Sequence, residues 1–217
     1  MNTKEILLKK FNNNGIVDKF TRFEFRKFQK EALKYIFDQN VLICAPTGSG
    51  KSLVAEIAAF YNALIKGKKV LYVVPLKALA KERYQKFLDY NTNLKISLSS
   101  SDYDENYEKL GKNDILIITS EKADSLIRHN PSWIKEISLL IADEIHLIND
   151  YERGPILEFV ITYFKIKKAQ ILGLSATIGN KEELAEWLNA KLIFSSERPV
   201  KLNYGVLKDN KIYFKKF

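Results

Sequence analysis

The sequence predicts an α/β fold, a sandwich of helices around a mainly parallel central sheet. Short apolar runs of three to six residues alternate with longer segments of helical periodicity along the chain. Strands that alternate with helices at this density are typical of βαβ units, whose strands are parallel. Polar residues follow directly after several apolar runs, where the carboxyl ends of parallel strands meet and ligands bind. These observations together favour one sheet with helices on both faces.

The individual elements are placed from hydrophobic periodicity and from turn residues. Strands are expected at residues 41–44, 70–75, 95–98, 114–119, 139–142, 170–174 and 192–194. Helices are expected at residues 27–37, 51–66, 77–90, 121–129, 155–165 and 180–189, with a further short helix within residues 1–20. Asn180, followed three residues later by Glu183, has the pattern of a capping box. The polar and acidic residues 99–112 are expected to be exposed.

Composition limits the classes of protein to which the chain can belong. With 217 residues and 46% hydrophobic content, it can bury a proper core within one domain. No apolar run approaches the roughly 20 residues that cross a bilayer, and the N-terminus lacks the apolar segment of a secretory signal. Cys44 is the single cysteine, so it cannot form an internal disulfide and is expected to be a small buried hydrophobe. A reducing cytoplasmic setting is consistent with these features.

The net charge of +9 suggests a nucleic-acid partner, but the distribution of the charge weakens that argument. Five of these charges lie after Glu197, where six basic residues are accompanied by one acidic residue. Such a tail is as readily a solvated strand or a linker as a binding arm, so these interpretations stay open.

The most informative stretch joins the first expected strand to the helix after it. Residues 41–44 are apolar, and a glycine-containing turn leads to helical periodicity from Lys51 onward. A helix that begins in this way offers free backbone N–H groups and the positive end of its dipole to an anion. Lys51 can reach the outer phosphates of a nucleotide, and the Ser52 hydroxyl can ligate magnesium. The residues expected to hold a nucleoside triphosphate are Pro46, Thr47, Gly48, Ser49, Gly50, Lys51 and Ser52.

One residue departs from the general phosphate-loop pattern, because Ala45 stands where that pattern has its first glycine. A chance Gly-Lys-Ser sequence after an apolar run is the alternative explanation. The strand before the turn and the helix after it favour a nucleotide site.

Asp143 and Glu144 follow the apolar run 139–142, at the edge of the sheet where the phosphate loop is also expected. A single aspartate is enough for magnesium, which otherwise binds phosphates and water. Glu144 can act as the general base that deprotonates an attacking water. An Asp-Glu pair after an apolar run is often merely solvated, so it is the neighbouring phosphate loop that favours chemistry here.

The remaining polar candidates are less specific. A lone histidine such as His146 is more often structural, and His129 has no supporting context. Without a cluster of cysteines and histidines neither of them indicates a zinc site, and no G-x-S-x-G elbow indicates a serine hydrolase. Ser175 and Thr177 can relay between two ligands or simply cap the end of a strand.

Taken in order, these motifs resemble the first motor domain of superfamily 2 helicases. Residues 45–52 are similar to motif I of that family, where alanine at the first position is ordinary, and residues 74–80 resemble motif Ia. Residues 143–146, Asp-Glu-Ile-His, are similar to the DExH form of motif II, and residues 175–177 resemble motif III. Gln29 stands where the family has its adenine-reading glutamine.

More specific segments narrow the resemblance to the Ski-type DExH group. Within that group the chain looks closest to archaeal DNA helicases that act in repair and at stalled forks. The segments that carry this resemblance are residues 119–128, 152–155, 157–158 and 174–180.

The resemblance implies a RecA-like fold and a role for each matching residue. Lys51 and Ser52 would bind phosphate and Mg²⁺, Asp143 would hold the metal, and Glu144 would activate water for ATP hydrolysis. The grip on the nucleic-acid backbone, independent of sequence and sensitive to salt, would come from Pro75, Lys77, Ala78, Thr119 and Ser120. The residues that would couple nucleotide state to this grip are His146, Ser175 and Thr177.

The resemblance also implies three segments: an N-terminal extension (1–20), a RecA-like motor domain (21–198), and the start of a linker to a second motor domain (199–217). Helicases of this type need the second domain because it supplies an arginine finger worth about 10³- to 10⁵-fold in related phosphoryl transfer. Nothing after Thr177 resembles the glycine-and-arginine motif of that domain. We therefore expect the N-terminal piece of a longer helicase, nearly inactive by itself.

The expected function is ATP-dependent 3′-to-5′ DNA unwinding in repair or at stalled forks. ATP and Mg²⁺ are the expected cofactors, single-stranded or forked DNA is the expected partner, and the archaeal cytosol is the expected location. The alternatives are a Ski-type RNA helicase, a translocase on duplex DNA, and a nucleotide-dependent binding module without turnover. The aromatic residue that stacks on a nucleotide base also stays open among Phe20, Phe23, Phe25 and Phe28.

Overall fold

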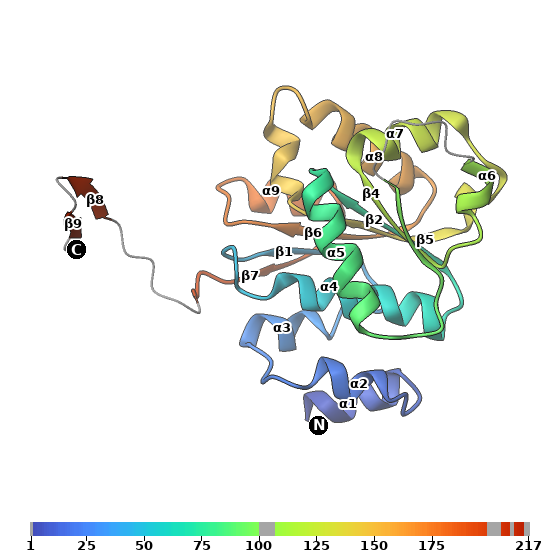
Figure 1. The fold of residues 1–217 in the computed structure, drawn as a ribbon, viewed down its shortest axis with the longest axis horizontal. Helices are drawn as coiled ribbons and strands as arrows, with labels where there is room; N and C mark the ends of the chain where they lie inside the picture. Colours follow the sequence, from blue (N-terminus) through green and yellow to red (C-terminus); the bar gives the residue numbers. More distant parts are fainter. Residues whose placement is uncertain (1, 100–106, 199–204, 209–210, 215–217) are drawn as a thin grey trace.

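The computed structural model describes residues 2–99, 107–198, 205–208 and 211–214 of the chain. Its centre is a seven-stranded sheet in the order β3-β4-β2-β5-β6-β1-β7, and neighbouring strands in it pair in parallel throughout. The strands are β1 (Val41–Cys44), β2 (Lys69–Val74), β3 (Ile96–Ser99), β4 (Ile115–Thr119), β5 (Ile137–Ala142), β6 (Gln170–Ser175) and β7 (Lys191–Phe194). Helices cover both faces of this sheet (Figure 1), so the predicted α/β sandwich is confirmed.

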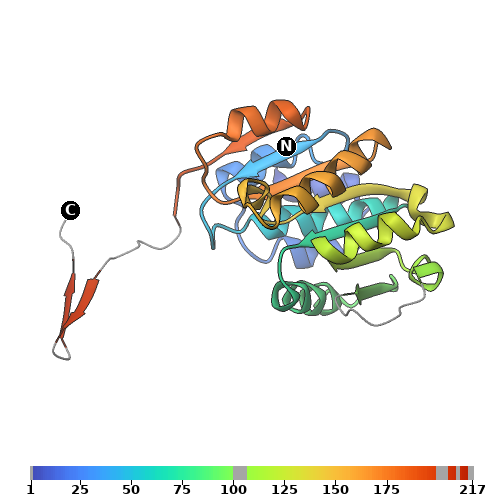
Figure 2. The same cartoon turned by 90° about the horizontal axis from the view of Figure 1, so that it is seen from above.

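The two helical layers come from different parts of the chain (Figure 2). One layer contains α1 (Thr3–Lys10), α2 (Ile16–Phe20), α3 (Lys27–Ala32), α4 (Lys51–Phe60) with the π-helical turn η1 (Tyr61–Ile65), and α5 (Lys77–Asp89). The other contains α6 (Tyr107–Leu110), α7 (Ser120–His129), α8 (Gly154–Ile166) and α9 (Lys181–Trp187), with the 3₁₀ turns η2 (Ser132–Glu136) and η3 (Ile145–Asn149).

Strand β2 shows why the sheet separates the core into two clusters. Val70, Tyr72 and Val74 pack into the cluster of the first layer, whereas Leu71 and Val73 pack into that of the second. Successive side chains of a strand point to opposite faces, and a strand that is buried on both sides is therefore apolar at every position. This explains the continuous apolar runs of the sequence.

The N-terminal helices belong to the same core as the phosphate-loop strand. Leu7 and Phe11 from the α1 region and Val17 and Phe20 from α2 are buried in the cluster that contains Ile43 of β1. The boundary that the sequence places after residue 20 stays a prediction, although α2 packs as part of the first layer.

The predicted strands agree with the structure within two residues at each end, but two helical details were wrong. The helix expected at 27–37 ends at Ala32, because the N–H groups of Lys34 and Tyr35 bond three residues back and tighten the chain into turns. Asn180 precedes α9 without a side-chain cap, since its backbone (φ −96°, ψ 31°) lacks the extended conformation that a capping residue needs.

Several short elements were not expected from the sequence. They include α6, η3 and an antiparallel hairpin of β8 (Gly205–Lys208) and β9 (Lys211–Phe214) in the basic tail. Residues 100–106 of the segment expected to be exposed lie outside the described residues. No helix in the described ranges is long and apolar enough to span a membrane.

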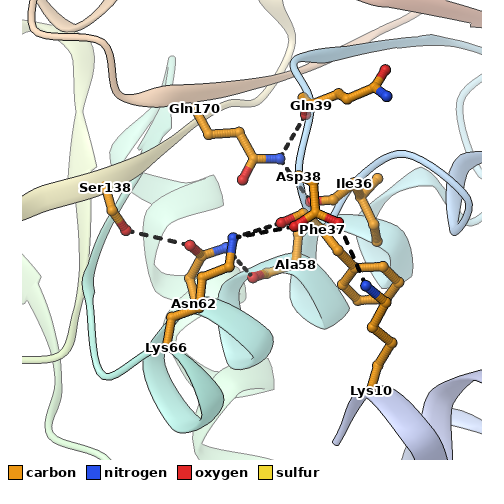
Figure 3. A network of polar contacts seen from close by, with 10 residues as sticks. All are labelled: Lys10, Ile36, Phe37, Asp38, Gln39, Ala58, Asn62, Lys66, Ser138 and Gln170. Carbon is orange, nitrogen blue, oxygen red and sulfur yellow. Dashed lines mark hydrogen bonds and ion pairs between the residues drawn. The ribbon is translucent and has the colours of Figure 1, made fainter.

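A polar network at the amino ends of the strands fixes the chain that enters β1 (Figure 3). The side-chain amide of Gln170, at the start of β6, donates to the carbonyls of Ile36 (2.7 Å) and Gln39 (2.6 Å). The ammonium group of Lys66 donates to the carbonyl of Phe37 at 2.6 Å. These bonds satisfy the carbonyls of an irregular segment and position β1 for the loop at its other end.

Candidate nucleotide and nucleic-acid site

The loop after β1 has the backbone of an anion site. Gly48 and Gly50 have φ values of 75° and 91°, in the left-handed region that glycine adopts without steric cost. Gly50 precedes α4, and no side chain caps the helix there. The first N–H groups of α4 are therefore left without a side-chain acceptor, and the positive end of the helix dipole adds to their attraction for an anion.

Lys51 lies inside this loop. Its ammonium group donates to the carbonyls of Ala45 (2.8 Å) and Pro46 (3.2 Å) and is buried. Burial lowers the pKa of Lys51, and the nearby carboxylates of Glu144 and Asp143 oppose this shift. The structure therefore brings the ammonium group of Lys51, the first residue of α4, close to the acidic residues that follow β5.

Three donors fix the Asp143 carboxylate. Its Oδ2 accepts from the Tyr72 hydroxyl and from Nε of Arg83, both at 3.0 Å, and its Oδ1 accepts from the Glu144 N–H at 3.1 Å. The Asp143 and Arg83 side chains are 3% and 11% exposed. Arg83 was missed by sequence reasoning, because a basic residue in the middle of an amphipathic helix gives no local signal of a contact with a distant strand.

Glu144 and His146 lie together beside the aspartate. Glu144 has φ 54°, a left-handed backbone that costs roughly 1–2 kcal/mol for a residue with a side chain. Its Oε2 lies 3.3 Å from Nδ1 of His146. Strain of this kind persists where the surroundings determine the conformation, and it is found mainly at functional sites. The structure therefore pairs His146 with the predicted general base.

A cavity of about 780 Å³ joins these elements. Of the predicted residues, Thr47, Gly48, Gly50, Lys51, Ser52, Asp143 and Glu144 line it. Ser52 and Asp143 supply oxygen atoms of the kind that Mg²⁺ prefers, so the lining fits a magnesium–triphosphate group. Pro46 and Ser49, which were predicted with these residues, are buried and are not among the residues that line the cavity.

The cavity wall opposite the phosphate loop and Asp143 was not predicted from the sequence. It is formed by the end of α2 with the turn after it and by the inner side of α5, at Lys19, Phe20, Arg22, Phe23, Leu79, Glu82, Arg83, Lys86, Asp89 and Tyr90. Phe23 is 81% exposed and Phe20 only 1%, so Phe23 is the ring with a face open to a ligand. Phe25 and Phe28 are core residues.

Glu56 of α4 also lines the cavity. Its Oε2 accepts from the Tyr90 hydroxyl at 2.7 Å, and its Oε1 lies 3.9 Å from Nζ of Lys86, beyond hydrogen-bonding distance. Burial raises the pKa of Glu56, opposed by the hydrogen bond from Tyr90 and by the charge of Lys86. This bond ties the phosphate-loop helix to the end of α5.

The buried side chain of Gln29 contacts the phosphate loop at Gly50. Its amide oxygen accepts from the N–H of Arg26 (2.8 Å), and its amide nitrogen donates to the carbonyl of Gly50 (2.9 Å). The side chain is buried, and a Cβ at position 50 would lie 2.7 Å from its nitrogen. Gln29 therefore braces the loop, and its contact with adenine stays a prediction.

Strand β6 lies between β1 and β5, so Ser175 ends between the two halves of the nucleotide site. Its hydroxyl donates to the carbonyl of Ala176 at 2.8 Å and is fully buried, whereas Thr177 is exposed. Among the contacts of the described residues, His146 meets Glu144 and not Ser175. Cys44 is buried beside Ser175, and burial raises the pKa of its thiol.

The predicted nucleic-acid residues fall into an exposed and a buried group. Lys77 and Ala78 are exposed at the start of α5, which has no side-chain cap, and Pro75 just before it is half-buried. Thr119 and Ser120 are 4% and 3% exposed, and the Thr119 hydroxyl caps α7. Because β2 and β4 are neighbours, both helices begin at the same edge of the sheet.

Comparison with known proteins identifies the family to which this arrangement belongs. The chain is 56% identical over 169 residues to the ATP-dependent DNA helicase Hel308 of Pyrococcus abyssi, covering 77% of this chain and 24% of that protein. It is 48% identical over 210 residues to the protein of the same name from Methanocaldococcus jannaschii, covering 92% of this chain and 17% of the relative. The chain thus spans about a quarter or less of the length of these relatives.

A solved structure and a family model agree with these relatives. The crystal structure of the DUF1998 helicase MrfA bound to DNA shares the fold, with a TM-score of 0.68 at 20% identity, over 91% of this chain and 30% of that one. The family model described as DEAD/DEAH box helicase matches residues 26–185, well over half of the chain. The chain belongs to the DEAD/DEAH box helicase family.

Proposed function

We propose that the chain is the N-terminal ATP-binding motor domain of an ATP-dependent 3′-to-5′ DNA helicase that acts in repair or at stalled forks. The observation that carries the proposal is the meeting of Lys51, Ser52, Asp143 and Glu144 in one cavity at the carboxyl edge of the sheet. The likeness to the Hel308 proteins, which are named ATP-dependent DNA helicases, supports DNA as the substrate. The proposed location is the archaeal cytosol.

The chain's own residues divide the hydrolytic work in the following way. The loop at residues 46–50 holds the phosphates through its backbone, and Lys51 neutralises their charge. Ser52 and Asp143 would hold magnesium, which would supply positive charge to the phosphoryl oxygens. Glu144 takes the proton of the attacking water. His146 lies 3.3 Å from the Glu144 carboxylate and orients that carboxylate. Gln29, which braces the loop, is assigned to the adenine, and the exposed ring of Phe23 stacks on the base.

Nucleic acid binds at the edge where α5 and α7 begin. The uncapped first turn of α5, with Lys77 and Ala78 exposed, suits a phosphate group of the DNA backbone. Thr119 and Ser120 take part through the backbone N–H groups of the first turn of α7, since both side chains are buried. Such contacts are independent of base sequence, so binding weakens as salt rises.

A second motor domain completes the site. Efficient phosphoryl transfer in related motors needs an arginine finger, worth about 10³- to 10⁵-fold. The relatives, about three times as long as the chain or longer, leave room for such a domain. The isolated chain is therefore proposed to bind Mg-ATP weakly and to hydrolyse it very slowly.

The test is the ATPase rate of the longest natural protein that contains this chain, measured with single-stranded DNA, forked DNA, duplex DNA and RNA. Stimulation by single-stranded and forked DNA, together with unwinding of a substrate that has a 3′ tail, is the expected result. Stronger stimulation by RNA would identify a Ski-type RNA helicase, and stimulation by duplex without unwinding would identify a translocase. ATP binding without hydrolysis under all conditions would identify a binding module.

A further inference from the structure

We propose that Arg83 is a positioning residue that couples the grip on the nucleic-acid backbone, at the start of α5, to the orientation of Asp143. This inference rests on the proposed function and adds to it the element that transmits the signal. According to this inference, α5 transmits a displacement from the bound nucleic acid to the nucleotide site.

The buried ion pair between Arg83 and Asp143 fixes the orientation of the Asp143 carboxylate. Nε of Arg83 lies 3.0 Å from Oδ2 of Asp143, and both side chains are buried. Taking two charges out of water is costly unless their geometry is good and their other bonding groups are satisfied. The Tyr72 hydroxyl, 3.0 Å from the same oxygen, completes that shell. The orientation of the carboxylate therefore depends on where α5 places its arginine.

Helix α5 is fixed at its C-terminal end. The Tyr90 hydroxyl donates to Glu56 of α4 at 2.7 Å, and the Phe60 ring lies 4.7 Å from Tyr90 and 5.2 Å from Phe87 between centroids. These contacts attach the end of α5 to the helix that follows the phosphate loop. They act as a pivot, because a packed aromatic cluster resists displacement.

At the other end, α5 is packed on the core from Ala80 onward, and its first two residues face solvent. Lys77 and Ala78 are exposed there, and no side chain caps the helix. Arg83 lies six residues after Lys77, about 9 Å along the helix at a rise of 1.5 Å per residue. It is thus placed between the pivot and the nucleic-acid end. A phosphate group that draws the first turn of α5 towards it shifts Arg83, and with it the carboxylate that holds magnesium.

Tyr72 provides a matched control for this coupling. It donates to the same oxygen of Asp143 but belongs to β2 in the middle of the sheet. Tyr72→Phe loosens Asp143 but keeps the ring that packs against Phe87 of α5, 5.8 Å away between centroids, so it lowers the ATPase rates with and without DNA by a similar factor. Arg83→Gln loosens Asp143 and also cuts the link to α5.

The experiment measures the stimulation ratio, the ATPase kcat with saturating single-stranded DNA divided by kcat without DNA, in the longest natural protein that contains this chain. Arg83→Gln is expected to lower the ratio about tenfold or more, and Tyr72→Phe to leave it within about twofold of the unsubstituted protein. Binding of a fluorescent ATP analogue and the melting temperature confirm that both variants are folded.

Two results would overturn the inference while leaving the proposed function in place: an unchanged ratio in Arg83→Gln, or an equal loss of the ratio in Tyr72→Phe. If Arg83→Gln does not fold, Arg83→Lys decides, because lysine keeps the charge but replaces the planar fork with a single ammonium group. A fall of about threefold is then expected, and an unchanged ratio contradicts the coupling. Lack of DNA stimulation in the unsubstituted protein would overturn the proposed function, and the inference with it.

Discussion

Replacing Glu144, the proposed general base, with glutamine is expected to separate nucleotide binding from hydrolysis. The substitution keeps the shape of the side chain and removes its basicity, while Lys51 and the loop that binds phosphate stay unchanged. The structure holds the carboxylate in the cavity by a left-handed backbone (φ 54°) and by His146, 3.3 Å away. A glutamine oxygen or nitrogen can meet the same imidazole. Loss of a positioned general base lowers kcat by about 10²- to 10⁴-fold, equivalent to roughly 3 to 5 kcal/mol of barrier.

The assay combines phosphate release with titration of a fluorescent ATP analogue, in the longest natural protein that contains the chain and with single-stranded DNA present. The dissociation constant is expected to stay within about threefold, because the substitution removes a negative charge near the phosphates and no phosphate ligand. Glu186→Gln, on the exposed side of α9, removes the same charge outside the cavity and serves as control. Parallel loss of binding and turnover in Glu144→Gln, or a kcat close to that of the control, would refute the assignment of Glu144 as base.

Two further predictions concern stability. A Cβ at Gly154 would lie 2.3 Å from the carbonyl oxygen of Ile148, so Gly154→Ala should lower the free energy of unfolding by about 1–3 kcal/mol. Gly179→Ala, where a Cβ meets nothing within 4 Å, is the control, and equal denaturation midpoints would contradict the clash. The raised pKa of Glu56 stabilises the fold below the ordinary value of 4.5, and this contribution is lost as pH rises through the folded pKa. Glu56→Gln keeps an acceptor for Tyr90, so its unfolding free energy should fall less than that of the unsubstituted chain between about pH 5 and about pH 8; equal slopes would count against the buried charge.

The sheet and half of the site were predictable because their signals are local. A strand such as Val41–Cys44, buried on both faces, must be apolar throughout, and the residues that follow parallel strands must meet at one edge. The sequence alone therefore predicts that Lys51 and Asp143 lie close together, although 91 residues separate them.

The rest of the site depends on contacts between distant segments. The bond between Arg83 and Asp143 is set by how far α5 is rotated over the sheet, and a sequence pattern gives a helix face only approximately. The cavity wall at Lys19 and Phe23 depends on α2 lying against the main core, although the sequence suggested a separate extension. The capping box predicted at Asn180 does not form, because a cap also depends on the backbone conformation of the capping residue, which the sequence pattern does not give.

The π-helical turn Tyr61–Ile65 determines how the chain tolerates insertions and deletions after the phosphate-loop helix. A π-helical turn has one more residue between its hydrogen-bonded groups than an α-helical turn. Each residue of an α-helix adds about 100° of rotation. Within the turn, Asn62 accepts from the Ser138 hydroxyl at 3.3 Å; directly after it, Lys66 donates to the Phe37 carbonyl at 2.6 Å. A single-residue deletion within this turn would restore an ordinary helix and rotate one of these two bonds out of reach. The number of residues between β1 and β2 is therefore constrained, whatever their identity.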